Sequence, residues 1–569
     1  MRAVIVFCCL NTVWSWNGPE VDTPLGRVRG LWKVSYNGKR YSSFEGIPYA
    51  KPPIGNLRFE EAVPIDPWPG TWNATKTSNR CMQTNITGEG EVQGNEDCLY
   101  LNIYVPGKRI VPYKKYDVLL QIHGGAYMTG SGTDVAESSF VLDMDLIYVA
   151  INYRLGVFGF LSTEDHVLPG NNAMKDQVLA MKWVKSNIEF FGGNPDSVTL
   201  IGHSAGGSSV HLHTLSPMSR GLFHRAFAGS GVALSPWVIK EKPAIFAKKM
   251  AALLGCPTEP SHLLKDCLKT RPANHFIDNY REFFGYGHLP FAPFSPVVEK
   301  HSRNPFLTKL PYEAIKDGDV ADVPLLISTV RDEGLYPAYY FLDHFEDVDP
   351  VFPDVAHFLL DYNYTLPKEK RIQVAKQIKD LYLGPGEQIS NATYKKFFKI
   401  FSDRDYIAPS EMAAKAQAKV MRSPVYYYYF DYNSEILPTS ILMTGRDLDV
   451  VSHTGDTIYS LGQAMNGLRF TGDDNEMKDK LQNIITYFVK TGFPSFDGCN
   501  TWKNVDKGID LTYLHIAGPN DMKVRSIKSL GNADFWRQFG LGETERDVTP
   551  YDNSFFLHSK RFMYFNKNE

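Results

Sequence analysis

Short apolar runs, bounded by polar or glycine-rich turns, recur along this chain. From about Pro19 to Tyr153, strand-like runs and turns alternate, and similar runs return later. Short apolar runs between turn signals are typical of strands buried inside a sheet. The clearest runs cover residues 117–122, 196–201, 324–330 and 425–430. The pattern predicts a large central sheet. The last run, with four consecutive tyrosines, is interpreted as a late core strand rather than an exposed aromatic platform.

Apolar residues at helical spacing predict helices between these strands. One set recurs at intervals of 3, 3 and 4 residues and would pack one face against the sheet: Val178, Met181, Val184 and Ile188. A second amphipathic set lies near the end of the chain: Met477, Leu481, Ile484, Ile485 and Phe488. The irregular aromatic stretch from Phe276 to Phe294 is interpreted as a lid or gorge wall.

A pentapeptide follows the strand at 196–201 directly: Gly202-His203-Ser204-Ala205-Gly206. It fits the G-x-S-x-G nucleophile elbow, and Ala205–Leu215 reads as the start of the helix that this motif requires. A Cβ at either flanking glycine would collide with the neighbouring strand and helix. Ser204 is therefore the candidate nucleophile, whereas an ordinary glycine-rich turn is the alternative reading.

A second glycine-rich motif, His123-Gly124-Gly125-Ala126-Tyr127, ends the strand at 117–122. Lipases and esterases carry such a loop, because small residues let backbone N–H groups converge on the oxyanion formed during acyl transfer. We expect Gly125, Ala126 and Ala205 to supply these donors and Gly124 to form the turn that aims them. A flexible loop tip is the alternative for this motif alone.

An acid and a base should follow the nucleophile, in that order along the chain. The strand at 324–330 runs into Arg331-Asp332-Glu333-Gly334, so either Asp332 or Glu333 could orient an imidazole. Five histidines lie further on: His344, His357, His453, His515 and His558. His453 is the preferred base because it lies in a loop rich in Ser, Thr and Gly, where functional side chains concentrate.

With these motifs and others, the chain resembles the type-B carboxylesterase/cholinesterase family of α/β-hydrolases, and most closely the secreted carboxylesterases of insects. The further matching segments are 44–50 (FEGIPYA), 96–102 (EDCLYLN), 152–156 (NYRLG), 176–177 (DQ) and 191–195 (FGGNP). The resemblance implies an α/β-hydrolase fold, with a large, mostly parallel central sheet and helices on both faces. It also implies a serine carboxylic ester hydrolase with an acyl-enzyme intermediate.

The same resemblance implies roles for particular residues. Glu333 is the expected acid, His453 the expected base, and Ser230 a serine hydrogen-bonded near the acid. Two disulfides that close small loops are expected, Cys81 with Cys98 and Cys256 with Cys267. Cys499 is then left over, as a buried free thiol or a site of intermolecular pairing.

Length and composition agree with an enzyme of this kind, whose mechanism needs no metal or organic cofactor. The 569 residues contain 43% hydrophobic and 22% charged residues, and no low-complexity linker divides them. Residues 16–569 are therefore expected to form one domain. Lys and Arg number 60 against 63 Asp and Glu, so nothing suggests a nucleic-acid partner. The pair His211 and His213 cannot share a helix face, and no metal site is expected.

The N-terminus predicts secretion. Residues 1–15 combine Arg2, an apolar run and a cleavage site after Ser15, as signal peptides do. Four N-x-[ST] sequons fit a secreted glycoprotein: Asn73, Asn85, Asn363 and Asn391. No apolar tail follows for an anchor or a membrane span. The oligomeric state is not encoded in any of these patterns.

The class of substrate is predicted from two features that cholinesterases have and this sequence lacks. Cholinesterases hold a quaternary ammonium with a Trp in the first disulfide loop and an acidic residue before the nucleophile. Residues 81–98 contain no Trp, and His203 precedes Ser204. Juvenile-hormone esterases usually have Gln where this chain has His203. A neutral, apolar ester is therefore the expected substrate. A non-catalytic adhesion member of the fold and a slow organophosphate scavenger are the alternatives.

Overall fold

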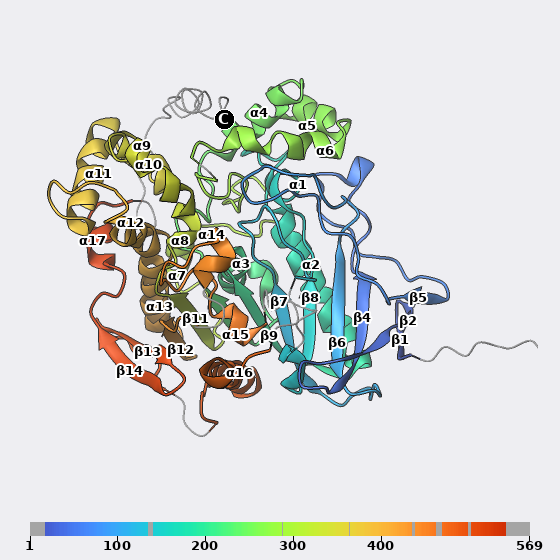
Figure 1. Ribbon diagram of the computed structural model, residues 1–569. Helices are drawn as coiled ribbons and strands as arrows, with labels where there is room; N and C mark the ends of the chain where they lie inside the picture. The colour runs from blue at the N-terminus through green and yellow to red at the C-terminus, as the bar shows by residue number, and fades with distance from the viewer. Residues whose placement is uncertain are drawn as a thin grey trace, which may run out of the picture.

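An 11-stranded mixed sheet runs through the protein (Figure 1), in the order β14-β13-β12-β11-β10-β9-β7-β8-β6-β4-β3. The structure, a computed structural model, describes residues 18–134, 140–286, 288–363, 365–434, 439–462, 469–498 and 502–541. Six of the ten neighbouring strand pairs are parallel, from β8 through β13, and four pairs toward the two edges are antiparallel. The fold is thus the expected α/β-hydrolase arrangement, with a mostly parallel central sheet.

The strands of this sheet are β3 (Leu31–Val34), β4 (Arg40–Pro48), β6 (Tyr100–Pro106), β7 (Tyr116–Ile122), β8 (Ile147–Ile151), β9 (Gly193–His203), β10 (Arg225–Gly229), β11 (Leu325–Val330), β12 (Val425–Phe430), β13 (Leu511–Gly518) and β14 (Asp521–Ile527). A small separate sheet joins β1 (Glu20–Thr23), β2 (Gly26–Arg29) and β5 (Thr71–Asn73). Each predicted strand run has a counterpart among them. The run at 196–201 becomes the longer strand β9.

Alternate side chains of the central strands enter two separate hydrophobic clusters. Tyr427 of β12 joins one cluster, whereas Tyr426 and Tyr428 join the other. In β7, Leu120 and Leu119 divide in the same way. Because successive residues of a strand point to opposite faces, a strand with both faces covered must be apolar throughout. This is why the core strands appear in the sequence as unbroken apolar runs.

Helices cover both faces of the sheet. On one face α3 contacts β9 and β10, and α2 and α3 share the hydrophobic cluster of that face. On the other face α16 contacts β7 and β9. The helix predicted around Val178 corresponds to α2, the helix after Ser204 to α3, and the helix around Leu481 to α16. Helices α4–α6 and α9–α12 gather above the sheet in Figure 1.

The helices are α1 (Gly156–Phe160), α2 (Asn172–Asn187), α3 (Ala205–Leu215), α4 (Pro243–Leu253), α5 (Ser261–Lys269), α6 (Ala273–Asp278), α7 (Pro311–Lys316), α8 (Leu335–Ala338), α9 (Phe345–Val348), α10 (Phe352–Leu359), α11 (Lys368–Tyr382), α12 (Tyr394–Phe401), α13 (Ala408–Val420), α14 (Thr439–Thr444), α15 (Thr457–Ser460), α16 (Gly472–Thr491) and α17 (Ala533–Arg537). A π-helical segment, η8 (Ser402–Ile407), joins α12 to α13. No helix of the described residues is both long and apolar enough to cross a bilayer.

Candidate active site

Ser204 lies at a sharp turn between β9 and α3. Its backbone has φ 59° and ψ −126°, a conformation that L-residues rarely adopt. Its N–H donates to the carbonyl of Gly229 at the end of the adjacent strand β10, at 2.9 Å. The strained backbone is therefore held by the sheet on one side and by the helix on the other.

The two glycines of the elbow are required by space. A Cβ on Gly202 would lie 2.4 Å from the backbone of Gly206, and a Cβ on Gly206 would lie 2.1 Å from the carbonyl oxygen of Ile122. These atoms belong to the first turn of α3 and to the end of β7. The glycines thus let the nucleophile strand, the helix and the neighbouring strand approach closely, as the motif predicts.

The loop His123–Thr129 brings backbone N–H groups beside Ser204. Gly124 packs against the elbow so closely that a Cβ would lie 2.6 Å from the carbonyl oxygen of His203. Gly125 has φ +104°, and its carbonyl accepts from the N–H groups of Met128 and Thr129. The N–H groups of Gly125 and Ala126 donate to no acceptor among the described residues. Ala205 is the first residue of α3, where a helix N–H has no intrahelical partner.

Buried polar side chains fix this loop from behind. The Gln83 amide accepts from Thr129 Oγ1 at 2.7 Å and from the Gly130 N–H at 2.9 Å, and it donates to the Gly130 carbonyl at 3.0 Å. Tyr153 donates to the His123 carbonyl at 2.8 Å and stacks on the His123 ring, with centroids 4.3 Å apart. The loop is therefore braced at both ends by side chains that do not face the cavity.

The candidate acid Glu333 is in contact with the candidate base His453. The strand pattern had left open whether Asp332 or Glu333 would make this contact. His453 Nδ1 and Glu333 Oε2 are 2.5 Å apart, and both side chains are buried. Glu333 Oε1 accepts from the Val330 N–H at 2.9 Å. Asp332 turns away and accepts from Arg331 Nε at 2.6 Å and from the Val451 N–H at 2.9 Å. Of the two candidates, only Glu333 contacts the imidazole.

Aromatic rings hold the His453 imidazole in place. Tyr336, three residues after Glu333, stacks on it with centroids 4.9 Å apart, and Tyr406 of the π-helical segment lies at 4.6 Å. His453 Nε2 is buried and has no hydrogen-bond partner among the described residues. Ser204 lines the same cavity. Without substrate, the hydrogen bond between nucleophile and base is often long, and it tightens in the reacting complex.

Ser230 lies on the loop after β10, fully buried, with φ 47°. Its N–H donates to the Ser328 carbonyl at 2.8 Å. Its hydroxyl has no hydrogen-bond partner among the described residues, so the expected bond toward Glu333 is not formed here. Any role of Ser230 in supporting the acid stays a prediction.

His203, directly before Ser204, lies near a second buried polar group, the carboxylate of Asp456. Its Nε2 is 3.9 Å from Asp456 Oδ2, which also accepts from the Tyr428 hydroxyl at 2.6 Å. Burial lowers the pKa of His203, the Asp456 carboxylate opposes this effect, and His453 adds to it. With a pKa below its usual value, His203 is neutral at neutral pH.

A cavity of about 290 Å³ opens onto these groups. Its lining combines the nucleophile, the base, the glycine-rich loop and several polar side chains: Arg80, Gln121, His123, Gly124, Gly125, Thr129, Gly130, Asp134, His203, Ser204, Tyr336, His453 and Thr454. Arg80 forms an ion pair with Asp134 there. The sequence motifs thus meet in one cavity, although they are spread over some 330 residues.

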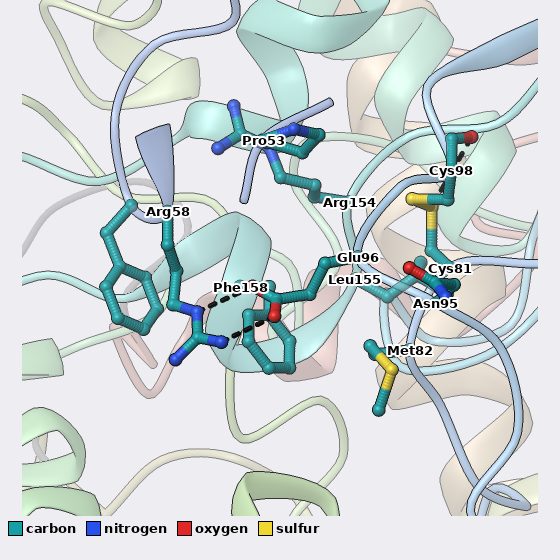
Figure 2. A pocket seen from close by; sticks show the side chains of 11 residues that line it. Pro53, Arg58, Cys81, Met82, Asn95, Glu96, Cys98, Arg154, Leu155 and Phe158 are labelled. Atoms are coloured by element: carbon teal, nitrogen blue, oxygen red, sulfur yellow. Dashed lines mark hydrogen bonds and ion pairs between the residues drawn. A yellow bond between two sulfur atoms is a disulfide. The ribbon is translucent and has the colours of Figure 1, made fainter. Parts of the chain in front are cut away.

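Both expected disulfides form. Cys81 and Cys98 are bonded with Cα atoms 5.0 Å apart, and Cys256 and Cys267 with Cα atoms 5.7 Å apart. Figure 2 shows Arg58 and the first disulfide on the lining of one pocket, and Arg58 binds Glu96 there through two hydrogen bonds of 2.6 and 2.5 Å. Arg58 also donates to carbonyls at the end of α5, the helix that carries Cys267. The two disulfide segments are therefore linked.

The predicted glycosylation sites and the two histidines of α3 differ in how far they are exposed. Asn73, Asn85 and Asn391 are exposed, whereas the Asn363 side chain is buried. His211 and His213 are both buried and hydrogen-bonded to neighbouring side chains, as structural histidines would be. The signal segment 1–15, Cys499 and His558 lie outside the described residues.

Several site residues were not predicted from the sequence. They are Gln83, Arg80, Gln121, Asp134, Tyr336, Tyr406 and Asp456. Two of them had a positional signal, because Tyr336 and Asp456 each lie three residues after a predicted catalytic residue, one helical turn away. The others come from segments whose contact with the site is set only by the fold.

Comparisons with known proteins show the family to which the chain belongs. The model of the family described as "Carboxylesterase family" matches residues 17–536. "Venom carboxylesterase-6" of Apis mellifera is 40% identical over 93% of this chain and 95% of its own length. "Esterase E4" of Myzus persicae is 37% identical over 93% of this chain and 96% of its own length.

A crystal structure of juvenile hormone esterase from Manduca sexta, with OTFP covalently attached, superposes on this structure with a TM-score of 0.81. It is 27% identical over 91% of this chain and 99% of that chain. The chain therefore belongs to the carboxylesterase family and is a carboxylic ester hydrolase of the α/β-hydrolase fold.

Proposed function

We propose that this protein is a secreted serine carboxylesterase that hydrolyses neutral esters through an acyl-enzyme on Ser204. The observation that carries the proposal is the buried contact between Glu333 and His453 Nδ1, which leaves Nε2 free in the cavity that Ser204 lines. An imidazole held in this way has one tautomer, with its proton on Nδ1 and a lone pair on Nε2. It can then act as a general base.

In the first half-reaction, His453 Nε2 takes the proton of Ser204 while Oγ attacks the ester carbonyl carbon. The Glu333 carboxylate stabilises the imidazolium that forms. The tetrahedral intermediate collapses, the bond to the alkoxy oxygen breaks, and the imidazolium gives its proton to the departing alcohol. Water then attacks the acyl-enzyme with the same base, which releases the carboxylic acid and restores Ser204.

Gly125, Ala126 and Ala205 are the proposed donors to the oxyanion. Their N–H groups lie on either side of the elbow, and those of Gly125 and Ala126 have no other acceptor among the described residues. A preorganised donor of this kind stabilises the transition state by about 3 kcal/mol. The +0.5 charge at the N-terminus of α3 acts in the same direction.

A neutral ester suits the electrostatics of the cavity. Arg80 and Asp134 neutralise each other in an ion pair, and the lowered pKa of His203 leaves that ring uncharged. No carboxylate on the wall faces a cationic substrate without a basic partner among the described residues. A choline ester, whose quaternary ammonium would need an unpaired anionic group on the wall, is not favoured.

Secretion is proposed from three features. The N-terminal 15 residues have the composition of a signal peptide, two disulfides are present, and three sequons are exposed. The mature chain, residues 16–569, is proposed to form one carboxylesterase-type domain. Its partner is a small-molecule ester, and the chemistry requires no cofactor.

The test is hydrolysis of p-nitrophenyl esters of increasing acyl length by the secreted protein. Ser204→Ala should abolish turnover, and a fluorophosphonate probe should label the wild type but not this variant. Ser410→Ala is a matched control, since Ser410 is also a buried serine and its hydroxyl has no partner among the described residues. That control should keep full activity.

Two outcomes would overturn the proposal. A protein that neither turns over any ester nor reacts with the probe is a binding member of the fold. A protein that reacts once with an organophosphate or an ester, but does not turn over, is a scavenger rather than an esterase.

A further inference from the structure

Gln121 is a buried amide at the end of β7 that faces the catalytic cavity. Its side chain is 6% exposed, and it lines the cavity two residues before the glycine-rich loop. Its Oε1 accepts from the Tyr148 hydroxyl. Its Nε2 has no hydrogen-bond partner among the described residues. A glutamine in the interior of an apolar strand therefore directs an amide donor toward the space where substrate binds.

The orientation of this amide is fixed from behind. Burial raises the pKa of Tyr148, so its phenol stays protonated and donates to Gln121. The Tyr148 ring is stacked on Tyr104, with centroids 5.8 Å apart and planes at 27°. With Oε1 occupied by this donor, the Nε2 hydrogens are left for the cavity. Gln121 is thus preorganised as a donor.

The rest of the wall near Gln121 is polar and carries little net charge. Arg80 and Asp134 form their ion pair on the same lining, and Thr129 adds a hydroxyl that is already bonded to Gln83. His203 Nε2 is buried and without a hydrogen-bond partner among the described residues. A wholly apolar substrate would leave the Gln121 donor unsatisfied, which is costly in a buried site.

We propose that this cavity selects neutral esters that carry a second acceptor oxygen, a hydroxyl, ether or ketone, on the part of the substrate that lies against Gln121. Gln121 is then a specificity-determining residue whose amide donates to that oxygen. This inference rests on the proposed esterase function and narrows its substrate class. A site that hydrogen-bonds one substrate group discriminates against the analogue that lacks it, because its own polar group would be left unpaired.

The test compares isosteric esters that differ only in the extra oxygen. In the alcohol arm, 4-hydroxybutyl butanoate is compared with pentyl butanoate. In the acyl arm, butyl 5-oxohexanoate is compared with butyl 5-methylhexanoate. In one arm the wild type should show a kcat/KM about 10-fold higher for the oxygen-containing ester, as one neutral hydrogen bond provides. The arm that responds identifies the side of the ester that meets Gln121.

The variants measure the ratio of the two kcat/KM values rather than activity alone. Gln121→Leu keeps the size of the side chain but removes the donor, so the ratio should fall to about 1. Gln417→Leu is the matched control, because Gln417 is another buried glutamine that bonds His211 and Thr214 and does not line the cavity. Its ratio should equal that of the wild type. Labelling of Ser204 by a fluorophosphonate verifies that each variant is folded.

If Gln121→Leu does not fold, Gln121→Met provides the second variant, since its unbranched thioether side chain has a similar length but no amide donor and should also lose the preference. A wild type that prefers the apolar ester in both arms overturns the inference, and so does a preference that survives in the variants. Failure of the proposed function looks different: the wild type would then hydrolyse neither these four esters nor p-nitrophenyl acetate.

Discussion

Asp332 and Glu333 are adjacent in the sequence but serve different parts of the molecule. Glu333 contacts His453 Nδ1, whereas Asp332 bonds Arg331 and the Val451 backbone. Asp332 also pairs with Ser452 in an isolated bridge, and so aligns the loop that carries His453 with the end of β11. One carboxylate therefore orients the imidazole, while its neighbour places the loop.

Glu333→Gln should reduce kcat by about 10³- to 10⁴-fold, because an amide cannot stabilise the imidazolium and can hold the wrong tautomer. KM should change little, since Glu333 does not line the cavity. Steady-state kinetics with p-nitrophenyl butanoate measure both constants.

Asp332→Asn is the neighbouring control. It weakens the bonds to Arg331 and Val451, so the main expected effect is a lower Tm with a much smaller loss of kcat. If the two variants were to exchange these phenotypes, the assignment of the acid to Glu333 would be wrong.

The proposed catalytic residues could be singled out in the sequence because motifs of close neighbours mark them. Ser204 lies within a pentapeptide whose two glycines are part of the motif, and the contact that requires Gly202 lies within that pentapeptide. The choice between Asp332 and Glu333 could not be made from strand periodicity, because it depends on where the strand ends. Gln121 was hidden inside an apolar run, and only the side of β7 that it faces reveals its contact with the cavity.

Among the elements, the first disulfide loop acts as a brace for the glycine-rich loop. Gln83 lies two residues after Cys81, donates to the Cys81 carbonyl at 2.9 Å and bonds both Thr129 and Gly130. Thr129 in turn closes the turn at Gly125, whose N–H is a proposed oxyanion donor. The position of that donor therefore depends on an amide outside the cavity.

Gln83→Ala should lower kcat by about 10- to 100-fold with little change in KM, because a displaced donor weakens transition-state binding more than ground-state binding. Affinity for a trifluoromethyl ketone, which forms a tetrahedral adduct, should fall in parallel. Gln93→Ala is the matched control, since Gln93 pairs with Gln83 through its backbone but has an exposed side chain. Equal losses in both variants would contradict a positioning role for Gln83.

The π-helical segment η8 shows what hydrophobic patterns cannot predict. The N–H of Gly334, directly after Glu333, donates to Ser402 Oγ at 2.8 Å. A Cβ on Gly334 would lie 1.9 Å from the Phe398 carbonyl oxygen. The helix around η8 thus packs on the acid loop and also supplies Tyr406 to His453. Its change of hydrogen-bond pattern has no signature in the spacing of apolar residues.

At the scale of the whole molecule, buried histidines should make stability depend on pH. Burial lowers the pKa of His211 to about 4 and that of His213 to about 3. Both are neutral in the folded state, whereas the unfolded chain protonates them near pH 6.5. The unfolded state therefore binds more protons below that pH, and stability falls as the pH drops from about 6.5 toward 4. By pH 5 each histidine should cost about 2 kcal/mol.

Urea unfolding at pH 7.5 and pH 5 measures this effect. His213→Asn should reduce the difference between the two pH values by about 2 kcal/mol. An unchanged difference would show that other groups control acid sensitivity.

Exposure also predicts which sequons carry glycans on the folded surface. Asn73, Asn85 and Asn391 are exposed and should be occupied, whereas Asn363, whose side chain is buried, should not. Peptide mass spectrometry of the secreted protein, before and after removal of N-glycans, identifies each site. A glycan on Asn363 would mean that its segment is modified before it packs.

The order of the strands along the chain makes completion of the proposed catalytic triad a late event in biosynthesis. The proposed nucleophile, Ser204, follows β9 and the proposed acid, Glu333, follows β11. The proposed base, His453, lies beyond β12, more than 100 residues after Glu333. A growing polypeptide thus has the elbow and the glycine-rich loop long before it has an imidazole to activate them. During synthesis the proposed triad cannot form until His453 has emerged, roughly four-fifths of the way along the chain, and β12 has docked. Products of this chain that are truncated before His453 should therefore have no esterase activity, even though they contain the elbow and the glycine-rich loop.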